Sequence, residues 1–142
     1  DIKENITLSY LNQIKELFIN DNILKKHADE YVEKLNIKAP SLNSKAIQLS
    51  GGNQQKVVIA KTLLKSPKVL ILDEPTRGID VGAKLEIYKI MNELIKNEII
   101  VIMIYSELEE ILGMSDRIAV MYEGELMVVM ERKEATQEKI MK

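Results

Sequence analysis

Apolar residues at helical spacing dominate the first 66 positions, where no strand pattern is convincing. They predict an amphipathic helix over about 22–36, with an apolar face at Leu24, Ala28, Tyr31, Val32 and Leu35. The same spacing predicts a helix over about 4–18, through Ile6, Leu8, Leu11, Ile14 and Leu17. The first part of the chain is therefore expected to be helical.

A third helix is expected to begin at the Ser50-Gly51-Gly52 turn and to run to about Lys65, because Ser66-Pro67 would stop it. Its apolar stripe would consist of Val57 or Val58, Ala60, Leu63 and Leu64. The stretch 39–44 contains Pro40 and is interpreted as a connector.

From residue 68 the pattern changes to short continuous apolar runs at 69–72, 99–104 and 118–121. Such runs are typical of parallel strands buried on both faces. The first two runs flank a helical stripe formed by Ile87, Ile90 or Met91, and Leu94. A short helix over about 107–112, ended by Gly113, would separate the second and third runs. This alternation predicts an α/β sheet with right-handed crossovers.

The end of the chain changes pattern once more. Residues 122–125 read as a hairpin turn into a strand over 126–130. A final helix is expected to open near Thr136.

Composition narrows the class of protein. The 142 residues are 46% hydrophobic and 30% charged, which is typical of a globular domain. The formal net charge of −2 offers no electrostatic case for a nucleic-acid partner. No apolar run approaches the roughly 20 residues that a membrane-spanning helix needs.

Two carboxylates, Asp73 and Glu74, follow directly on the apolar run 69–72. A buried parallel strand would place them at the carboxyl edge of the sheet, where α/β proteins bind ligands. In phosphoryl-transfer enzymes the Asp of such a pair holds Mg²⁺ and the Glu polarises the attacking water. The alternative, a polar strand end followed by a turn at Pro75, is disfavoured by the apolar run and by the string upstream.

That upstream string is Leu49-Ser50-Gly51-Gly52-Asn53. Its glycines lack the Cβ atoms that would block close approach of the backbone to a phosphate. The hydroxyl of Ser50 adds a hydrogen-bond donor, and the following helix offers unpaired N–H groups and the positive end of its dipole. The alternative is an ordinary helix start capped by Ser50.

A third string, Arg77–Lys84, has the look of a phosphate loop but lacks its spacing. Ala83 separates Gly82 from Lys84, and Leu85 stands where Ser or Thr would bind Mg²⁺. We interpret the string as a turn and helix start capped by Asp80.

The three strings, in this order, resemble those of the ATP-binding-cassette ATPases. Leu49–Asn53 is similar to the family's signature motif, with Asn53 where Gln is usual. Val69–Glu74 is similar to its Walker B strand with the catalytic glutamate, and Arg77–Asp80 to its D-loop. Further strings resemble one subfamily, the second cassette of the tandem ATPase in bacterial monosaccharide importers, ribose type closest: 53–56, 74–84, 106–108, 112–117 and 135–138.

The resemblance implies a P-loop NTPase-like α/β fold, with a helical signature subdomain over 1–66 and a Walker B and D-loop part of a parallel-sheet core over 67–142. It implies ATP and Mg²⁺ as cofactors, Asp73 as the metal ligand and Glu74 as the catalytic residue. The nucleotide-contacting residues would be Ser50, Gly51, Gly52, Asn53, Asp80 and Ser106.

The resemblance also implies partners and a location. Family members of this kind sit on the cytoplasmic face of the cell membrane, paired with a second cassette and with permease subunits, and act indirectly with a sugar-binding protein. In such pairs the signature motif of one cassette closes on the ATP of the other. Ser50, Gly51 and Gly52 would therefore serve a nucleotide bound by a different cassette, and Asp73, Glu74 and Ser106 the nucleotide bound by this one.

One departure from the family pattern bears on mechanism. Most cassettes carry a switch histidine where Ser106 stands in this chain. A serine cannot become a cation, so its contact with the γ-phosphate would be weaker and the two ATP sites would not be equivalent. The chain's single histidine, His27, is expected at the surface of the helix 22–36.

The other departure is the phosphate loop, since the sequence contains no glycine-rich loop ending in Gly-Lys-Ser/Thr. In the family that loop and its strand precede the matching region, so this chain would be a fragment that alone neither binds ATP tightly nor hydrolyses it. The phosphate-loop strand would lie between the strands 99–104 and 118–121. Without it we expect those strands either to pair directly or to recruit other chains by self-association.

Two alternative functions are weighed against this one. A non-catalytic interaction module or remnant without a phosphate loop would share the same motifs. A non-transport cassette of the DNA-repair or translation kind is disfavoured by the subfamily strings and by the absence of basic patches in the sequence. No residue of the chain names the sugar.

Overall fold

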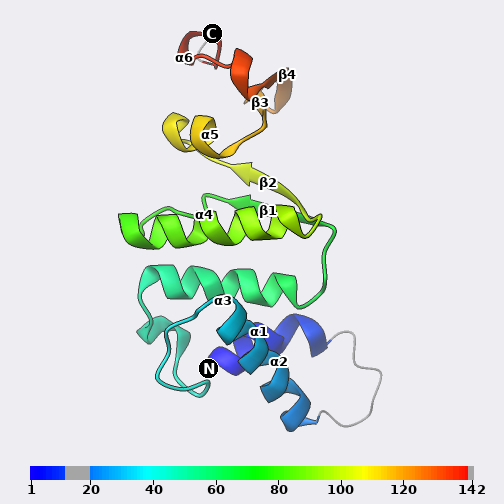
Figure 1. Cartoon of the computed structure of the whole chain (residues 1–142), viewed down its shortest axis with the longest axis vertical. Helices are drawn as coiled ribbons and strands as arrows, with labels where there is room; N and C mark the ends of the chain where they lie inside the picture. The colour runs from blue at the N-terminus through cyan, green and yellow to red at the C-terminus, as the bar shows by residue number, and fades with distance from the viewer. Residues whose placement is uncertain (12–19, 141–142) are drawn as a thin grey trace. The chain divides into compact units, whose positions relative to one another are not determined.

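The computed structural model describes residues 1–11 and 20–140 of the chain, and only the backbone of Leu11 (Figure 1). Compact packing divides it into two units, Asp1–Met103 and Ile104–Lys142. The elements in chain order are α1 (Ile2–Leu11), α2 (Asp21–Lys34), the 3₁₀ turn η1 (Ala46–Gln48), α3 (Gly51–Leu63), β1 (Val69–Asp73), α4 (Val81–Lys96), β2 (Ile100–Ile104), α5 (Leu108–Met114), β3 (Arg117–Tyr122), β4 (Glu125–Glu131), η2 (Arg132–Glu134) and α6 (Gln137–Ile140). The division predicted at residue 66, between a signature subdomain and a core portion, stays a prediction.

The helix predicted over 22–36 forms as α2. It begins where the side chain of Asn20 accepts a hydrogen bond from the N–H of Asn22, and it buries Leu24, Ala28 and Tyr31. It ends at Lys34, and two residues later Asn36 adopts a φ of +49°, a left-handed conformation that does not continue a helix and that Asn tolerates better than most residues. The predicted helix is confirmed, with its ends shifted by one or two residues.

The helix predicted over 4–18 begins earlier, since α1 starts at Ile2. Ile6 is fully buried, as its place in the stripe predicts, whereas Leu8 is 53% exposed. The side chain of Leu11 and the residues Ile14 and Leu17 lie outside the described part of the chain.

The third predicted helix is confirmed as α3, with Ser50 as the residue before its first turn. Val57, Ala60, Leu63 and Leu64 are buried as predicted, but Val58 is exposed, and Ile59 is fully buried without having been predicted. The physical reason is that α3 contacts α1 as well as α4, so its buried arc is wider than one stripe.

The first predicted strand–helix–strand unit is confirmed as β1, α4 and β2, with β1 and β2 paired in one parallel sheet. The buried stripe of α4 is formed by Ile87, Met91 and Leu94, as predicted. In Figure 1, α4 lies between α3 and the two strands.

The prediction that these strands are buried on both faces is wrong for this chain. Leu70 and Leu72 of β1 are buried, but Val69 and Ile71 between them are 45% and 63% exposed. Alternate residues of β2 are exposed as well: Ile100, Ile102 and Ile104. Among the described residues, helices cover one side of this sheet only, so each strand alternates instead of being apolar throughout.

The second unit contains the predicted hairpin. Strands β3 and β4 are antiparallel, with Arg117 opposite Glu131 and Tyr122 opposite Glu125. The turn uses positive φ at Glu123 (+47°) and Gly124 (+86°), the combination of a type I′ hairpin turn.

Two shorter predictions in this unit differ in outcome. Gly113 does not end the helix before the hairpin, because α5 continues through it to Met114, with no positive φ at the glycine. The last helix, α6, starts at Gln137, beside the predicted position.

Strands β2 and β3 lie in separate sheets, one formed by β1 and β2 and the other by β3 and β4. Direct pairing of the second and third predicted strands is therefore not found among the described residues. Self-association through the exposed strand surface stays a prediction.

Candidate functional site

The two predicted carboxylates stand at the end of β1, in different environments. Asp73 is the last residue of the strand and is exposed, whereas Glu74 is half-buried. Glu74 has a φ of +45°, a conformation that costs free energy for a residue with a Cβ. Its carbonyl oxygen accepts a hydrogen bond from the N–H of Arg77 at 3.1 Å, and the buried Pro75 and Thr76 hold the turn in place. Strained backbone of this kind gathers at functional sites, and the sequence pattern alone did not reveal it.

The predicted signature string forms the first turn of α3. Ser50 is exposed, and its hydroxyl makes no capping hydrogen bond to the helix. Instead, the Ser50 Oγ accepts a hydrogen bond from Asn53 Nδ2 at 2.9 Å, while Asn53 Oδ1 accepts one from the N–H of Lys38 at 2.8 Å. The alternative of an ordinary Ser-capped helix start therefore lacks its defining bond.

The two glycines of this string contact the segment that follows Glu74. A Cβ on Gly51 would lie 3.1 Å from Cγ2 of Ile79, and a Cβ on Gly52 would lie 2.5 Å from Cβ of Ala83. The second separation is shorter than carbon atoms tolerate, so the first turn of α3 packs on α4 only because residue 52 is a glycine. The structure thus brings two predicted strings together, and it gives Gly52 a packing role that sequence reasoning missed.

Asp80 caps α4 as predicted. Its Oδ1 accepts a hydrogen bond from the N–H of Ala83 at 3.0 Å, and its extended backbone (φ −72°, ψ 162°) is that of an N-cap residue. Gly78, with a φ of +73°, makes the turn that leads from β1 to this cap.

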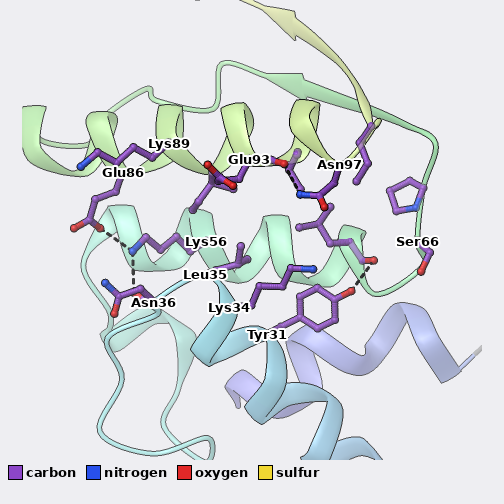
Figure 2. A pocket seen from close by; sticks show the side chains of 15 residues that line it. Tyr31, Lys34, Leu35, Asn36, Lys56, Ser66, Glu86, Lys89, Glu93 and Asn97 are labelled. Carbon is purple, nitrogen blue, oxygen red and sulfur yellow. Dashed lines mark hydrogen bonds and ion pairs between the residues drawn. The ribbon is translucent and has the colours of Figure 1, made fainter.

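A pocket of about 630 Å³ opens between the C-terminal end of α2, α3 and α4 (Figure 2). Neither Asp73 nor Glu74 lines it. Lys56, at its wall, has a side chain only 3% exposed, and its Nζ donates to the carbonyl oxygen of Asn36 at 2.8 Å and pairs with Glu86 Oε2 at 2.7 Å. The sequence analysis assigned no role to Lys56. The available signal was its spacing, because a residue four positions after Gly52 lies on the same face of the helix, the face that packs on α4.

Tyr31 crosses from α2 to α3 at the same pocket. Its hydroxyl donates to the carbonyl oxygen of Leu63 at 3.0 Å. Burial, and secondarily the negative charge of Glu30, raises the pKa of Tyr31 above its usual value.

The remaining predicted residues lie apart from this cluster. Ser106 is exposed, precedes α5 and belongs to the second compact unit. His27 was expected at the surface, but it is half-buried against Tyr10, with ring centroids 4.8 Å apart.

The described ranges 1–11 and 20–140 bear on metal binding and on membrane insertion. No cluster of three or more His, Cys, Asp or Glu side chains there could hold a metal ion. No helix there is long and apolar enough to cross a membrane. The exposed carboxylate of Asp73 fits Mg²⁺ only in the manner of nucleotide sites, where one or two carboxylates bind it together with phosphate oxygens.

Comparison with known sequences finds one family and a group of relatives. The profile of the family described as "ABC transporter" matches residues 2–77. The xylose import ATP-binding protein of Thermoanaerobacter pseudethanolicus is 57% identical over 142 residues, which cover 99% of this chain and 28% of that protein. The ribose import ATP-binding protein of Caldanaerobacter subterraneus is 55% identical, covering 99% of this chain and 29% of that protein. The chain thus spans less than a third of the length of these relatives.

Solved structures share its fold. A metal-chelate type ABC transporter in an inward-facing conformation superposes with a TM-score of 0.84 at 14% identity, covering 99% of this chain and 55% of that one. The protein cbiO1 of Clostridium perfringens, described as part of an ABC transporter complex, superposes with a TM-score of 0.74 at 28% identity, covering 99% of this chain and 55% of that one.

Proposed function

Because this chain belongs to the ABC transporter family of ATP-binding proteins, we propose that it is part of the second cassette of a tandem ATPase that powers import of a monosaccharide. The observation that carries the proposal is the order of its motifs on one compact unit. The signature string starts α3, Asp73 ends β1 with Glu74 directly after it, and the turn 75–79 leads from there to the capped start of α4. The relatives named for xylose and ribose import support a pentose or a similar sugar as cargo.

Each proposed site residue has a role that its position supports. Asp73, exposed at the strand end, would hold Mg²⁺, which neutralises charge on the phosphates of bound ATP. Glu74, held in its strained turn, would orient and polarise the attacking water. Its half-buried position limits competing contacts with bulk solvent, and Pro75 and Thr76 fix its backbone.

The signature string would act on a second nucleotide. Ser50 and Gly51 are exposed at the N-terminal end of α3, where backbone N–H groups and the helix dipole favour an anion. Asn53 would then act mainly by orienting Ser50, since its amide is already engaged with Ser50 Oγ and with the N–H of Lys38. Ser106 would contribute an uncharged hydrogen bond to the γ-phosphate, and Asp80 would shape the turn that approaches the other cassette.

The proposed partners are a second cassette, permease subunits and, indirectly, a sugar-binding protein. The proposed location is the cytoplasmic face of the cell membrane. The division into a signature subdomain over 1–66 and a core portion over 67–142 is proposed with them. The 142-residue chain, which lacks a Gly-Lys-Ser/Thr loop, is proposed not to hydrolyse ATP alone.

The test is ATP hydrolysis by the complete protein encoded by the gene that carries this sequence. Glu74→Gln is expected to lower kcat about 100-fold or more, because it removes the group that polarises water. Glu98→Gln is the matched control, since Glu98 also has a positive φ (+63°) and is exposed at the far end of α4. Equal activity of the Glu74→Gln variant and the wild type, or Glu74-dependent turnover by the 142-residue chain alone, would contradict the proposal.

A further inference from the structure

Lys56 carries a charge in a place where charges are rare. Its side chain is 3% exposed, although lysine is almost never fully buried unless it is paired. It lies one helical turn after Gly52, on the face of α3 that meets α4. Lys56 is not one of the proposed nucleotide-site residues, so that site does not explain why its charge is buried.

The first partner of Lys56 is the end of α2. Asn36 adopts φ +49° there, and the N–H of Ile37 bonds back to the carbonyl oxygen of Val32 at 2.8 Å, as in a left-handed helix cap. This leaves the carbonyl oxygen of Asn36 as the acceptor of Lys56 Nζ at 2.8 Å. Two residues further, the N–H of Lys38 donates to Asn53. The end of α2 is therefore bound twice by the first two turns of α3.

The second partner is Glu86, in the second turn of α4 (Figure 2). Its Oε2 lies 2.7 Å from Lys56 Nζ. The hydrogen bond from Lys56, followed by the charge of Lys56, lowers the pKa of Glu86, so the carboxylate is ionised at neutral pH. A buried cation thus reaches a half-exposed anion on the neighbouring helix.

The contact of Gly52 with Ala83 lies one turn before this ion pair. Gly52 and Lys56 are four residues apart on α3, and Ala83 and Glu86 are three apart on α4, so both contacts lie on facing sides of the two helices. The first contact requires close approach without a Cβ, and the second adds charge. Together they join the start of α3 to the start of α4.

We infer that Lys56 is a positioning residue which, with the Gly52–Ala83 contact, fixes the signature string to the segment 78–83, so that both move as one body. This inference deepens the proposed function and rests on it for its consequence. Ser50–Gly52 would touch the ATP of the other cassette, whereas residues 73–80 would surround the ATP of this one. Closure on one nucleotide would then reposition the turn at the other.

The first experiment changes a residue of α4 and measures hydrogen exchange at the start of α3. Glu86→Gln on α4 is introduced into the complete protein, and hydrogen exchange is measured for the segment 36–55 by mass spectrometry. Exchange is expected to rise about ten-fold in that segment, because α3 loses its anchor. Glu93→Gln is the matched control, since it removes the same charge from α4 at an exposed pair with Lys96. Unchanged exchange in Glu86→Gln, or an equal rise in Glu93→Gln, would overturn the inference.

Variants of Lys56 itself separate a positioning role from a general structural one. Lys56→Met is expected to lower kcat for ATP about ten-fold with little change in KM, and Lys56→Arg, which keeps a cationic donor, is expected to recover most of it. A change confined to KM, or equal losses in both variants, would count against positioning. Absence of ATPase activity in the wild type would refute the proposed function, while hydrogen exchange would still decide the inference.

The second experiment tests the contact between Gly52 of α3 and Ala83 of α4 by moving the Cβ atom from one residue to the other. Gly52→Ala is expected to raise hydrogen exchange in 36–55, because its Cβ would lie 2.5 Å from that of Ala83. Adding Ala83→Gly removes the clash and leaves Cα of residue 83 at 3.6 Å, an ordinary contact, so the double variant is expected to return to wild-type exchange. Failure of the double variant to recover would show that the contact with Ala83 does not explain the effect of Gly52→Ala, and it would overturn the part of the inference that rests on this contact.

Discussion

At the scale of single residues, Asn53 and Gly52 make contacts that the identity of the residue alone does not predict. Asn53 matches a nucleotide-contacting position, yet its amide bridges Ser50 and the backbone of Lys38. Gly52 was expected to leave room for a phosphate, and it also leaves room for Ala83. Both residues could be located from the sequence, but their contacts could not, because the residues that they contact come from other segments of the chain.

Tyr31 gives a residue-scale prediction. Its buried hydroxyl donates to Leu63, so Tyr31→Phe should lower the free energy of unfolding by about 1 kcal/mol at pH 7. Burial raises the pKa of Tyr31 in the folded state, so this contribution is fully present below the usual value of 10.0 and is lost as the pH rises through the folded-state pKa.

Thermal unfolding of wild type and Tyr31→Phe between pH 7 and 11 checks this prediction. The stability gap between them should close above pH 10. Tyr122→Phe serves as the control, since Tyr122 is 64% exposed. A gap that widens with rising pH would contradict the assigned hydrogen bond.

At the scale of elements, helical periodicity was sufficient for α2 and α4 and incomplete for α3. Each of the first two buries a single stripe that the spacing of apolar residues reveals. Helix α3 contacts helices on more than one side, so Ile59 is buried although it falls beside the expected stripe. The spacing of apolar residues predicts one buried face of a helix, whereas the number of helices packed around it decides how wide the buried face is.

Neighbouring positions of α3 test this account. Ile59→Ala should cost about 2–5 kcal/mol, because it leaves a cavity at a fully buried site. Val58→Ala removes two carbon atoms from a side chain that is 53% exposed and should cost less than about 0.5 kcal/mol. Urea unfolding of both variants provides the measurement, and similar midpoints for the two would show that the burial of α3 is assigned to the wrong face.

At the scale of the whole molecule, the fold class and the β3–β4 hairpin could be predicted, whereas the separation of β2 and β3 into different sheets could not. The α/β fold expected of a cassette ATPase is confirmed by the solved structures that superpose on the chain. The short apolar runs gave the strands their positions, but β3 pairs with β4 and not with β2. The hairpin follows from a turn that is local in the sequence, whereas pairing between β2 and β3 depends on contacts that no local pattern encodes.

The exposed sheet surface leads to a prediction about assembly. Val69 and Ile71 of β1 lie with Ile100, Ile102 and Ile104 of β2 on alternate, exposed positions. The 142-residue chain is therefore expected to self-associate at micromolar concentration, since apolar strands with unpaired edges recruit other chains.

Sedimentation velocity over a range of concentrations tests this expectation. Ile71→Lys should shift the chain toward monomer, because it places a charge on the most exposed apolar position of β1. Val81→Lys is the control, as Val81 is 75% exposed but belongs to α4. A monomer at every concentration for the unaltered chain would contradict the prediction.

The sequence by itself determined the elements, the family and the positions of the candidate site residues, because short-range periodicity and motif spacing are local properties of the chain. The tertiary structure decided what these residues touch. It placed Gly52 against Ala83, buried the charge of Lys56 between Asn36 and Glu86, and strained the backbone of Glu74. Such contacts join segments 20 to 31 residues apart, and only the packing of α2, α3 and α4 brings their atoms within bonding distance.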